Sequence, residues 1–143
     1  MAKWKVGLIG NGGICKGAHL STYLNDERLE VAAVCDIIEE RAQFLKDNYF
    51  PNAKVYTDYK ELLASGLVDA VIISTPHYFH PTIATYAFEK GIHVYSECIS
   101  NGTMAEGVEL VRAFEKTENF DDFFRRKKED VILLLRAYSI NIL

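Results

Sequence analysis

The chain has 143 residues and a formal net charge of −4, with 49% hydrophobic and 25% charged residues. This length suits one domain that buries about 70% of the surface its unfolded form exposes, so a core forms without disulfides. The acidic balance gives no attraction to phosphate backbones, which argues against a nucleic-acid partner. Three widely spaced cysteines, Cys15, Cys35 and Cys98, indicate reduced thiols, with neither a disulfide framework nor a metal site.

The first residues and the late apolar stretch of the sequence indicate where in the cell the protein is expected. The first residues lead into an apolar run without the pattern of a signal peptide, so we expect a cytoplasmic protein. The late apolar stretch 131–135 is shorter than the ~20 residues that span a bilayer, so we expect no membrane partner.

Short apolar runs alternate with helical patterns along most of the chain. The predicted strands are 5–9, 30–35, 54–56, 68–74 and 93–96, and the predicted helices are 14–24, 39–48, 59–65, 81–90 and 103–116. Mostly unbroken apolar strands are typical of a parallel sheet covered by helices on both faces. With right-handed crossovers this order predicts an α/β fold, a doubly wound parallel sheet of the Rossmann type. Asp58, Pro81 and Gly91 supply start and stop signals for these helices.

The pattern changes after about residue 119, which divides the chain into a dinucleotide-binding domain at 1–119 and an atypical tail at 120–143. The basic run 125–128 is bracketed by acids at 121–122 and 129–130, so a solvated face is favoured over a nucleic-acid or lipid patch. The apolar residues after 130 need burial, either on their own domain or against another copy. We expect self-association as a homo-oligomer.

A glycine turn follows the first predicted strand. It consists of Gly10, Asn11, Gly12, Gly13 and Ile14. Such glycines let the backbone turn sharply and bring its amides against a pyrophosphate. Asp36 ends the second predicted strand, where a dinucleotide-binding domain holds a ribose hydroxyl. The same glycines could serve a purely structural turn, but the strand, the helix and the acid around them favour a dinucleotide.

Two further positions refine this hypothesis. Cys15 takes the third glycine position of G-x-G-x-x-G, where a small residue still allows close helix–strand packing. A reactive thiol at a helix N-terminus is the alternative for Cys15. Asp36 accepts hydrogen bonds from both ribose hydroxyls and repels a 2′-phosphate, which favours NAD over NADP. Arg41, about one helical turn later, is a basic group that works against this preference.

A polar cluster follows the fourth predicted strand. It contains Ser74, Thr75, Pro76, His77 and His80. Ligands bind at the carboxyl ends of strands in doubly wound sheets, so the cluster faces the same crevice as Gly10 and Asp36. The spacing of its two histidines would suit a metal, but no third ligand accompanies them. We expect no metal, and histidines that line the pocket or satisfy backbone groups.

These motifs together resemble the Gfo/Idh/MocA family, which is glucose-fructose oxidoreductase and inositol dehydrogenase-like. The resemblance covers about residues 4–116 and rests on the glycine turn with His19 downstream, on 34–36, on 69–76 with His80, and on 91–97. It implies an NAD(P)-dependent oxidoreductase whose Rossmann-type domain holds the dinucleotide. A second α/β domain would hold most of a sugar or polyol, and hydride would move between a carbinol carbon and the nicotinamide.

The resemblance also assigns roles by family position. The turn 10–14 would hold the pyrophosphate, Asp36 the adenosine ribose, and 74–76 with His80 the nicotinamide half. Glu97 would lie beside the nicotinamide ribose, and His77 and Cys98 complete the expected cofactor-binding set. The family usually reads Glu-Lys-Pro where this chain has Glu97-Cys98-Ile99. A mostly neutral thiol does not replace the lysine cation, and losing such a group commonly costs ~10²-fold in rate.

This chain also lacks the length of a full family member, so no residue is assigned as the catalytic base. We therefore expect a chain that binds NAD but is weakly active or inactive alone. Two alternatives remain open. A non-catalytic NAD-sensing or assembly module would keep the fold, and a methyltransferase would share the glycine turn and the acid while binding S-adenosylmethionine. The run 74–76 and the segment around Glu97 argue against the methyltransferase.

Overall fold

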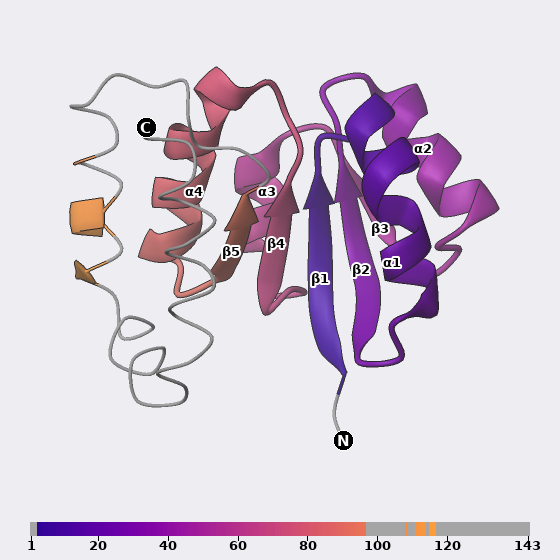
Figure 1. Ribbon diagram of the computed structural model, residues 1–143, viewed down its shortest axis with the longest axis horizontal. Helices are drawn as coiled ribbons and strands as arrows, with labels where there is room; N and C mark the ends of the chain where they lie inside the picture. The colour runs from indigo at the N-terminus through magenta and orange to yellow at the C-terminus, as the bar shows by residue number, and fades with distance from the viewer. Residues whose placement is uncertain (1–2, 97–107, 109–110, 114, 117–143) are drawn as a thin grey trace.

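The computed structural model describes residues 3–96, 108, 111–113 and 115–116. Within these residues the sheet has five parallel strands in the order β3-β2-β1-β4-β5 (Figure 1). The strands are β1 (Trp4–Ile9), β2 (Leu29–Cys35), β3 (Lys54–Tyr56), β4 (Ala70–Ile73) and β5 (His93–Ser96). The chain builds outward from β1 to β3 and then returns to place β4 on the other side of β1. The predicted doubly wound parallel sheet is confirmed.

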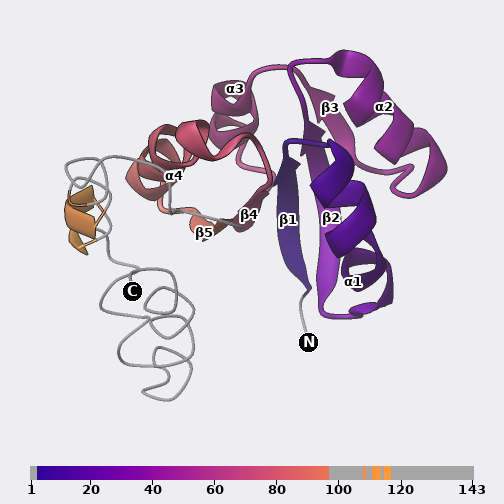
Figure 2. The same cartoon turned by 45° about the horizontal axis from the view of Figure 1, so that its top comes forward.

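Helices cover both faces of this sheet. They are η1 (Cys15–His19), α1 (Leu20–Asn25), α2 (Glu39–Asn48), α3 (Tyr59–Ala64), η2 (His77–Phe79) and α4 (His80–Glu89). Figure 2 shows α1 and α2 on one side of the strands and α3 and α4 on the other. Each side has its own apolar core, one containing Leu45 of α2 with Leu8 and Val34, the other containing Leu62 of α3 with Val71. The central strand β1 contributes to both cores.

Most predicted elements within the described residues are present, with two differences. The fourth strand, Ala70–Ile73, is shorter than the predicted 68–74, although the Asp69 and Ser74 amides still donate to carbonyls of β1 on either side of it. The first helix begins with the π-helical turn η1, which the apolar pattern did not signal. The predicted helix 103–116 and the tail 120–143 lie largely or wholly outside the described residues.

The local signals at the helix ends explain why these elements begin and end where they do. The side chain of Asp58 accepts a hydrogen bond from the Lys60 amide at 2.8 Å and caps α3. Pro81 occupies the first turn of α4, where its missing N–H costs nothing. Gly91 has φ +71° after α4, a conformation that glycine adopts without strain.

Within the described part of the chain, no helix has the length and apolar character needed to cross a membrane. The same residues contain no group of three or more His, Cys, Asp or Glu side chains placed to hold a metal ion.

Candidate dinucleotide-binding site

The carboxyl ends of three strands meet at the glycine turn. The Gly10 amide donates to the Cys35 carbonyl at 2.8 Å, and the Ser74 amide donates to the Ile9 carbonyl at 2.8 Å. The turn therefore lies between the ends of β2 and β4. Gly10 has φ +87°, and a Cβ there would lie 2.6 Å from the Thr75 nitrogen. Both observations require glycine at this position for the fold itself.

The next two glycines have a different environment. A Cβ added to Gly12 or Gly13 would meet no atom of the described residues within 4 Å. Neither position has a φ that excludes other residues. Packing within the described chain therefore does not demand glycine here, whereas a phosphate group approaching the backbone would. Ile14, the last residue of the turn, is 51% exposed.

Asn11 connects the glycine turn to the acid after β2. Its backbone amide donates to Asp36 Oδ2 at 2.7 Å, and its side-chain Nδ2 donates to the Leu8 carbonyl at 3.3 Å. The residue is completely buried, yet its Oδ1 has no hydrogen-bond partner within the described structure. A buried, unpartnered amide oxygen is uncommon in a folded protein and suits a site that a ligand completes.

Asp36 is buried to 7% exposure directly after β2. Its Oδ1 accepts a hydrogen bond from the Ile38 amide at 2.9 Å and lies 4.0 Å from Arg41 Nη1. The two backbone amides of Asn11 and Ile38 fix the orientation of the carboxylate. Because an ionised carboxylate has about four acceptor positions, Asp36 retains capacity for ribose hydroxyls.

The polar cluster after β4 is held by His80. Because a carbonyl oxygen only accepts, His80 Nε2 donates to the Thr75 carbonyl at 2.7 Å, and the Ser96 hydroxyl donates to Nδ1 at 2.9 Å. The side-chain hydroxyls of Ser74 and Thr75 are buried and have no partner within the described structure. Pro76 and His77 are exposed, whereas His80 is 2% exposed.

The structure thus brings most predicted site residues to one edge of the sheet: the turn 10–14, Asp36, and 74–77 with His80. Glu97 and Cys98 lie outside the described residues. Sequence reasoning did not find Ser96. The signal for it is the strand register, which pairs Ile73 with Ser96 and so places this hydroxyl beside the end of β4.

The two described cysteines are buried in the core. Burial raises the pKa of Cys15 to about 11, although a hydrogen bond from Asn11 opposes this, and burial raises the pKa of Cys35 to about 12. Both thiols are therefore protonated at neutral pH. These values favour the packing role of Cys15 over the reactive-thiol alternative.

These shifted pKa values predict an alkaline loss of stability. The folded state keeps both thiol protons to higher pH than the unfolded state, where a thiol titrates near 9.0. Their contribution is complete below pH 9 and is lost as pH rises from 9 towards 12. Urea unfolding at several pH values should show this fall, and it should be shallower in Cys35→Ala. An identical pH slope in both proteins would contradict the assignment.

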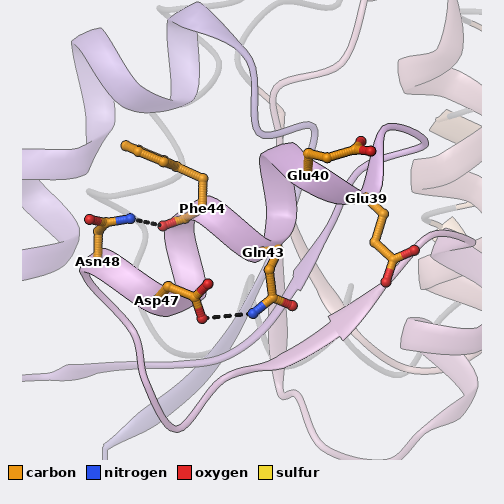
Figure 3. Close-up of a pocket in the computed structure, with 6 residues that line it drawn as sticks. All are labelled: Glu39, Glu40, Gln43, Phe44, Asp47 and Asn48. Carbon is orange, nitrogen blue, oxygen red and sulfur yellow. Dashed lines mark hydrogen bonds between the residues drawn. The ribbon is translucent and has the colours of Figure 1, made fainter.

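A shallow hollow on α2 is a separate feature (Figure 3). It is lined by Glu39, Glu40, Gln43, Phe44, Asp47 and Asn48. Hydrogen bonds within the helix join Gln43 to Asp47 at 2.7 Å and Asn48 to the Phe44 carbonyl at 2.8 Å. No residue of the glycine turn lines it, so it is distinct from the candidate site at the strand ends.

A parallel sheet in the order 3-2-1-4-5, with a glycine turn after β1 and an acid after β2, defines a doubly wound dinucleotide-binding domain. Comparison with protein families agrees with this class. The model of an oxidoreductase family with an NAD-binding Rossmann fold, Gfo/Idh/MocA, matches residues 4–120. The chain belongs to the Gfo/Idh/MocA oxidoreductase family.

Individual relatives show how much of a family member the chain covers. Inositol 2-dehydrogenase of Salmonella typhimurium is 34% identical over 113 residues, which are 78% of this chain and 33% of that protein. A glycosyl hydrolase family 109 protein of Shewanella pealeana is 32% identical over 122 residues, 80% of this chain and 26% of that protein. The crystal structure of an oxidoreductase from Thermotoga maritima aligns with a TM-score of 0.76 at 31% identity, covering 81% of this chain and 36% of that one. The chain therefore spans between about a quarter and just over a third of the length of these relatives.

Proposed function

We propose that this chain is an NAD-binding domain of an oxidoreductase and prefers NAD to NADP. The observation that carries the proposal is the Asp36 carboxylate, buried at the end of β2 and bonded to the Asn11 amide at 2.7 Å. This contact places a fixed negative charge beside the glycine turn, where the adenosine ribose lies when a dinucleotide crosses such a sheet.

The negative charge of Asp36 is expected to make the chain bind NAD more tightly than NADP. The carboxylate accepts hydrogen bonds from the 2′- and 3′-hydroxyls of NAD and repels the 2′-phosphate of NADP. Arg41 Nη1, 4.0 Å from Asp36 Oδ1, moderates this repulsion. The Arg41 side chain is half exposed, so solvent screens its charge and the preference for NAD is expected to hold.

The turn and the cluster after β4 account for the rest of the dinucleotide. The open space over Gly12 and Gly13 accommodates a pyrophosphate against the backbone. The unpartnered hydroxyls of Ser74 and Thr75 provide hydrogen bonds on the nicotinamide side. By family position, Glu97 and Cys98 would also contribute to binding the nicotinamide half.

Bound NAD supplies a hydride acceptor, and we propose that the 143 residues alone transfer hydride weakly or not at all. The relatives are about three times as long as the region matched here, and one of them is an inositol dehydrogenase. Substrate contacts of a sugar or polyol would come from regions that this chain does not match. Cys98 stands where the family usually has lysine, which further lowers the expected activity.

Isothermal titration calorimetry with NAD, NADH, NADP and S-adenosylmethionine tests the proposal. We expect binding of NAD and NADH, weaker binding of NADP, and no binding of S-adenosylmethionine. Binding of S-adenosylmethionine in place of NADH would support the methyltransferase alternative. No binding of any of the four would overturn the cofactor assignment and leave the fold.

Gly12→Ala should separate cofactor binding from folding. Its Cβ meets no described atom, so the free energy of unfolding should change by less than about 0.5 kcal/mol. The same methyl group enters the space proposed for the pyrophosphate, so NADH affinity should fall at least about 10-fold. Urea unfolding and calorimetry measure the two effects. Unchanged NADH affinity in the variant would show that the pyrophosphate lies elsewhere.

A non-catalytic NAD-sensing or assembly module is the second candidate, and Cys98 at the lysine position favours it. In that case NADH would change the oligomeric state of the chain, and Cys98→Lys would not produce polyol oxidation. Sedimentation velocity with and without NADH distinguishes this function from simple cofactor holding.

A further inference from the structure

His80 occupies a junction between three elements at the strand ends, on the side proposed for the nicotinamide. It is the first residue of α4, it bonds to Thr75 in the turn after β4, and it bonds to Ser96 at the end of β5. The backbone ladder between β4 and β5 ends at the Ile73–Ser96 pair. After the Ile73–Ser96 pair, the hydrogen bonds of the His80 side chain connect the turn that follows β4 to the end of β5.

The two hydrogen bonds engage both nitrogens of the ring. Donation from Nε2 to the Thr75 carbonyl leaves Nδ1 as the acceptor of the Ser96 hydroxyl in a neutral imidazole. At 2% exposure and with both nitrogens engaged, the ring has little surface to offer a ligand. Its effect on a cofactor must pass through the groups it holds.

The groups that His80 holds lie next to the glycine turn, where a shift of the backbone would move the proposed cofactor contacts. Thr75 is in van der Waals reach of the glycine turn, because a Cβ on Gly10 would lie 2.6 Å from its nitrogen. The unpartnered hydroxyls of Ser74 and Thr75 belong to the same short segment. Holding the Thr75 carbonyl therefore sets where both hydroxyls stand relative to the turn.

We propose that His80 is a positioning residue for the nicotinamide half of the dinucleotide. It acts by clamping the Thr75 carbonyl and the Ser96 hydroxyl, and it leaves the adenosine half to Asp36. This inference rests on the proposed cofactor function. It follows that removing the clamp should weaken binding of a ligand that carries nicotinamide and spare one that lacks it.

The test compares NADH with ADP-ribose, which carries the adenosine and pyrophosphate but no nicotinamide. In titrations of the full 143-residue chain, His80→Phe should lower NADH affinity about 10-fold or more and change ADP-ribose affinity less than about twofold. His80→Gln retains an N–H for the Thr75 carbonyl and should recover part of the NADH affinity. A purely structural role would lower both affinities together.

Two further variants keep the test decisive. Ser96→Ala removes one of the two hydrogen bonds without touching the buried ring, and it should weaken NADH alone by about threefold; it answers the question if His80→Phe does not fold. The matched control is His93→Phe. His93 is an exposed histidine at the start of β5, so its replacement should change neither affinity.

The outcomes separate the two proposals. Equal losses for NADH and ADP-ribose, or no loss for either, would overturn the role of His80 while leaving cofactor binding intact. A wild-type chain that binds neither ligand would overturn the cofactor function first, and the role of His80 with it.

Discussion

Replacing Gly10 with alanine is expected to destabilise the domain by about 3 kcal/mol or more. Alanine at φ +87° is strained, and its Cβ would lie 2.6–2.8 Å from backbone atoms of Ser74 and Thr75. Backbone atoms cannot move aside as a flexible side chain can. The ends of β1 and β4 would have to separate, which also disturbs the candidate site. Urea unfolding followed by circular dichroism measures the loss.

Gly17→Ala is the matched control for this variant. Gly17 lies in η1, where a Cβ would meet no described atom within 4 Å and no positive φ stands in the way. Because glycine inside a helix is less stable than alanine, this variant should be unchanged or more stable by about 0.5–1 kcal/mol. Similar effects at Gly10 and Gly17 would contradict the close contact between the turn and Thr75.

Asp36→Ala is expected to lower NADH affinity by about 10- to 100-fold, the usual contribution of a hydrogen-bonded charged group. NADP affinity should fall far less or rise, because the repulsion of the 2′-phosphate disappears while Arg41 remains. The ratio of the two dissociation constants, measured by calorimetry, is therefore the informative quantity. Equal losses for NADH and NADP would show that Asp36 supports the turn without reading the ribose.

Asp36 also holds the Asn11 and Ile38 amides, so its removal affects stability as well as binding. Asp58→Ala controls for this. Asp58 likewise follows a strand and accepts a backbone amide, that of Lys60, but this hydrogen bond caps α3 and does not join Asp58 to the glycine turn. Its loss should cost about 1 kcal/mol of stability and leave the NADH affinity unchanged.

Local patterns in the sequence were sufficient to predict most of the fold. Unbroken apolar runs marked the strands, and the signals at Asp58 and Pro81 marked helix starts, because each depends on residues close in sequence. The π-helical turn η1 was not predictable in this way. An apolar pattern that fits an α-helix does not report one extra residue in a turn.

The candidate site likewise contains features that local sequence predicts and features that depend on contacts between distant residues. The glycine turn and Asp36 were predicted because their spacing is a property of one β-α-β segment. The link from His80 to Ser96 joins residues 16 positions apart through the register of β4 and β5. The different needs for glycine at Gly10 and Gly12 also depend on a neighbour distant in sequence, Thr75. Such information appears only once the strands are paired.

The two apolar cores lie on opposite faces of the sheet, and the candidate site contains segments that pack against each of them. Asp36 precedes α2, whose Leu45 belongs to one core, while His80 begins α4, whose Ile83 belongs to the other. The segments proposed to bind the two halves of a dinucleotide therefore pack on opposite faces of the sheet. A cofactor bound at these strand ends would contact segments from both layers, so its binding should raise the stability of the two layers together.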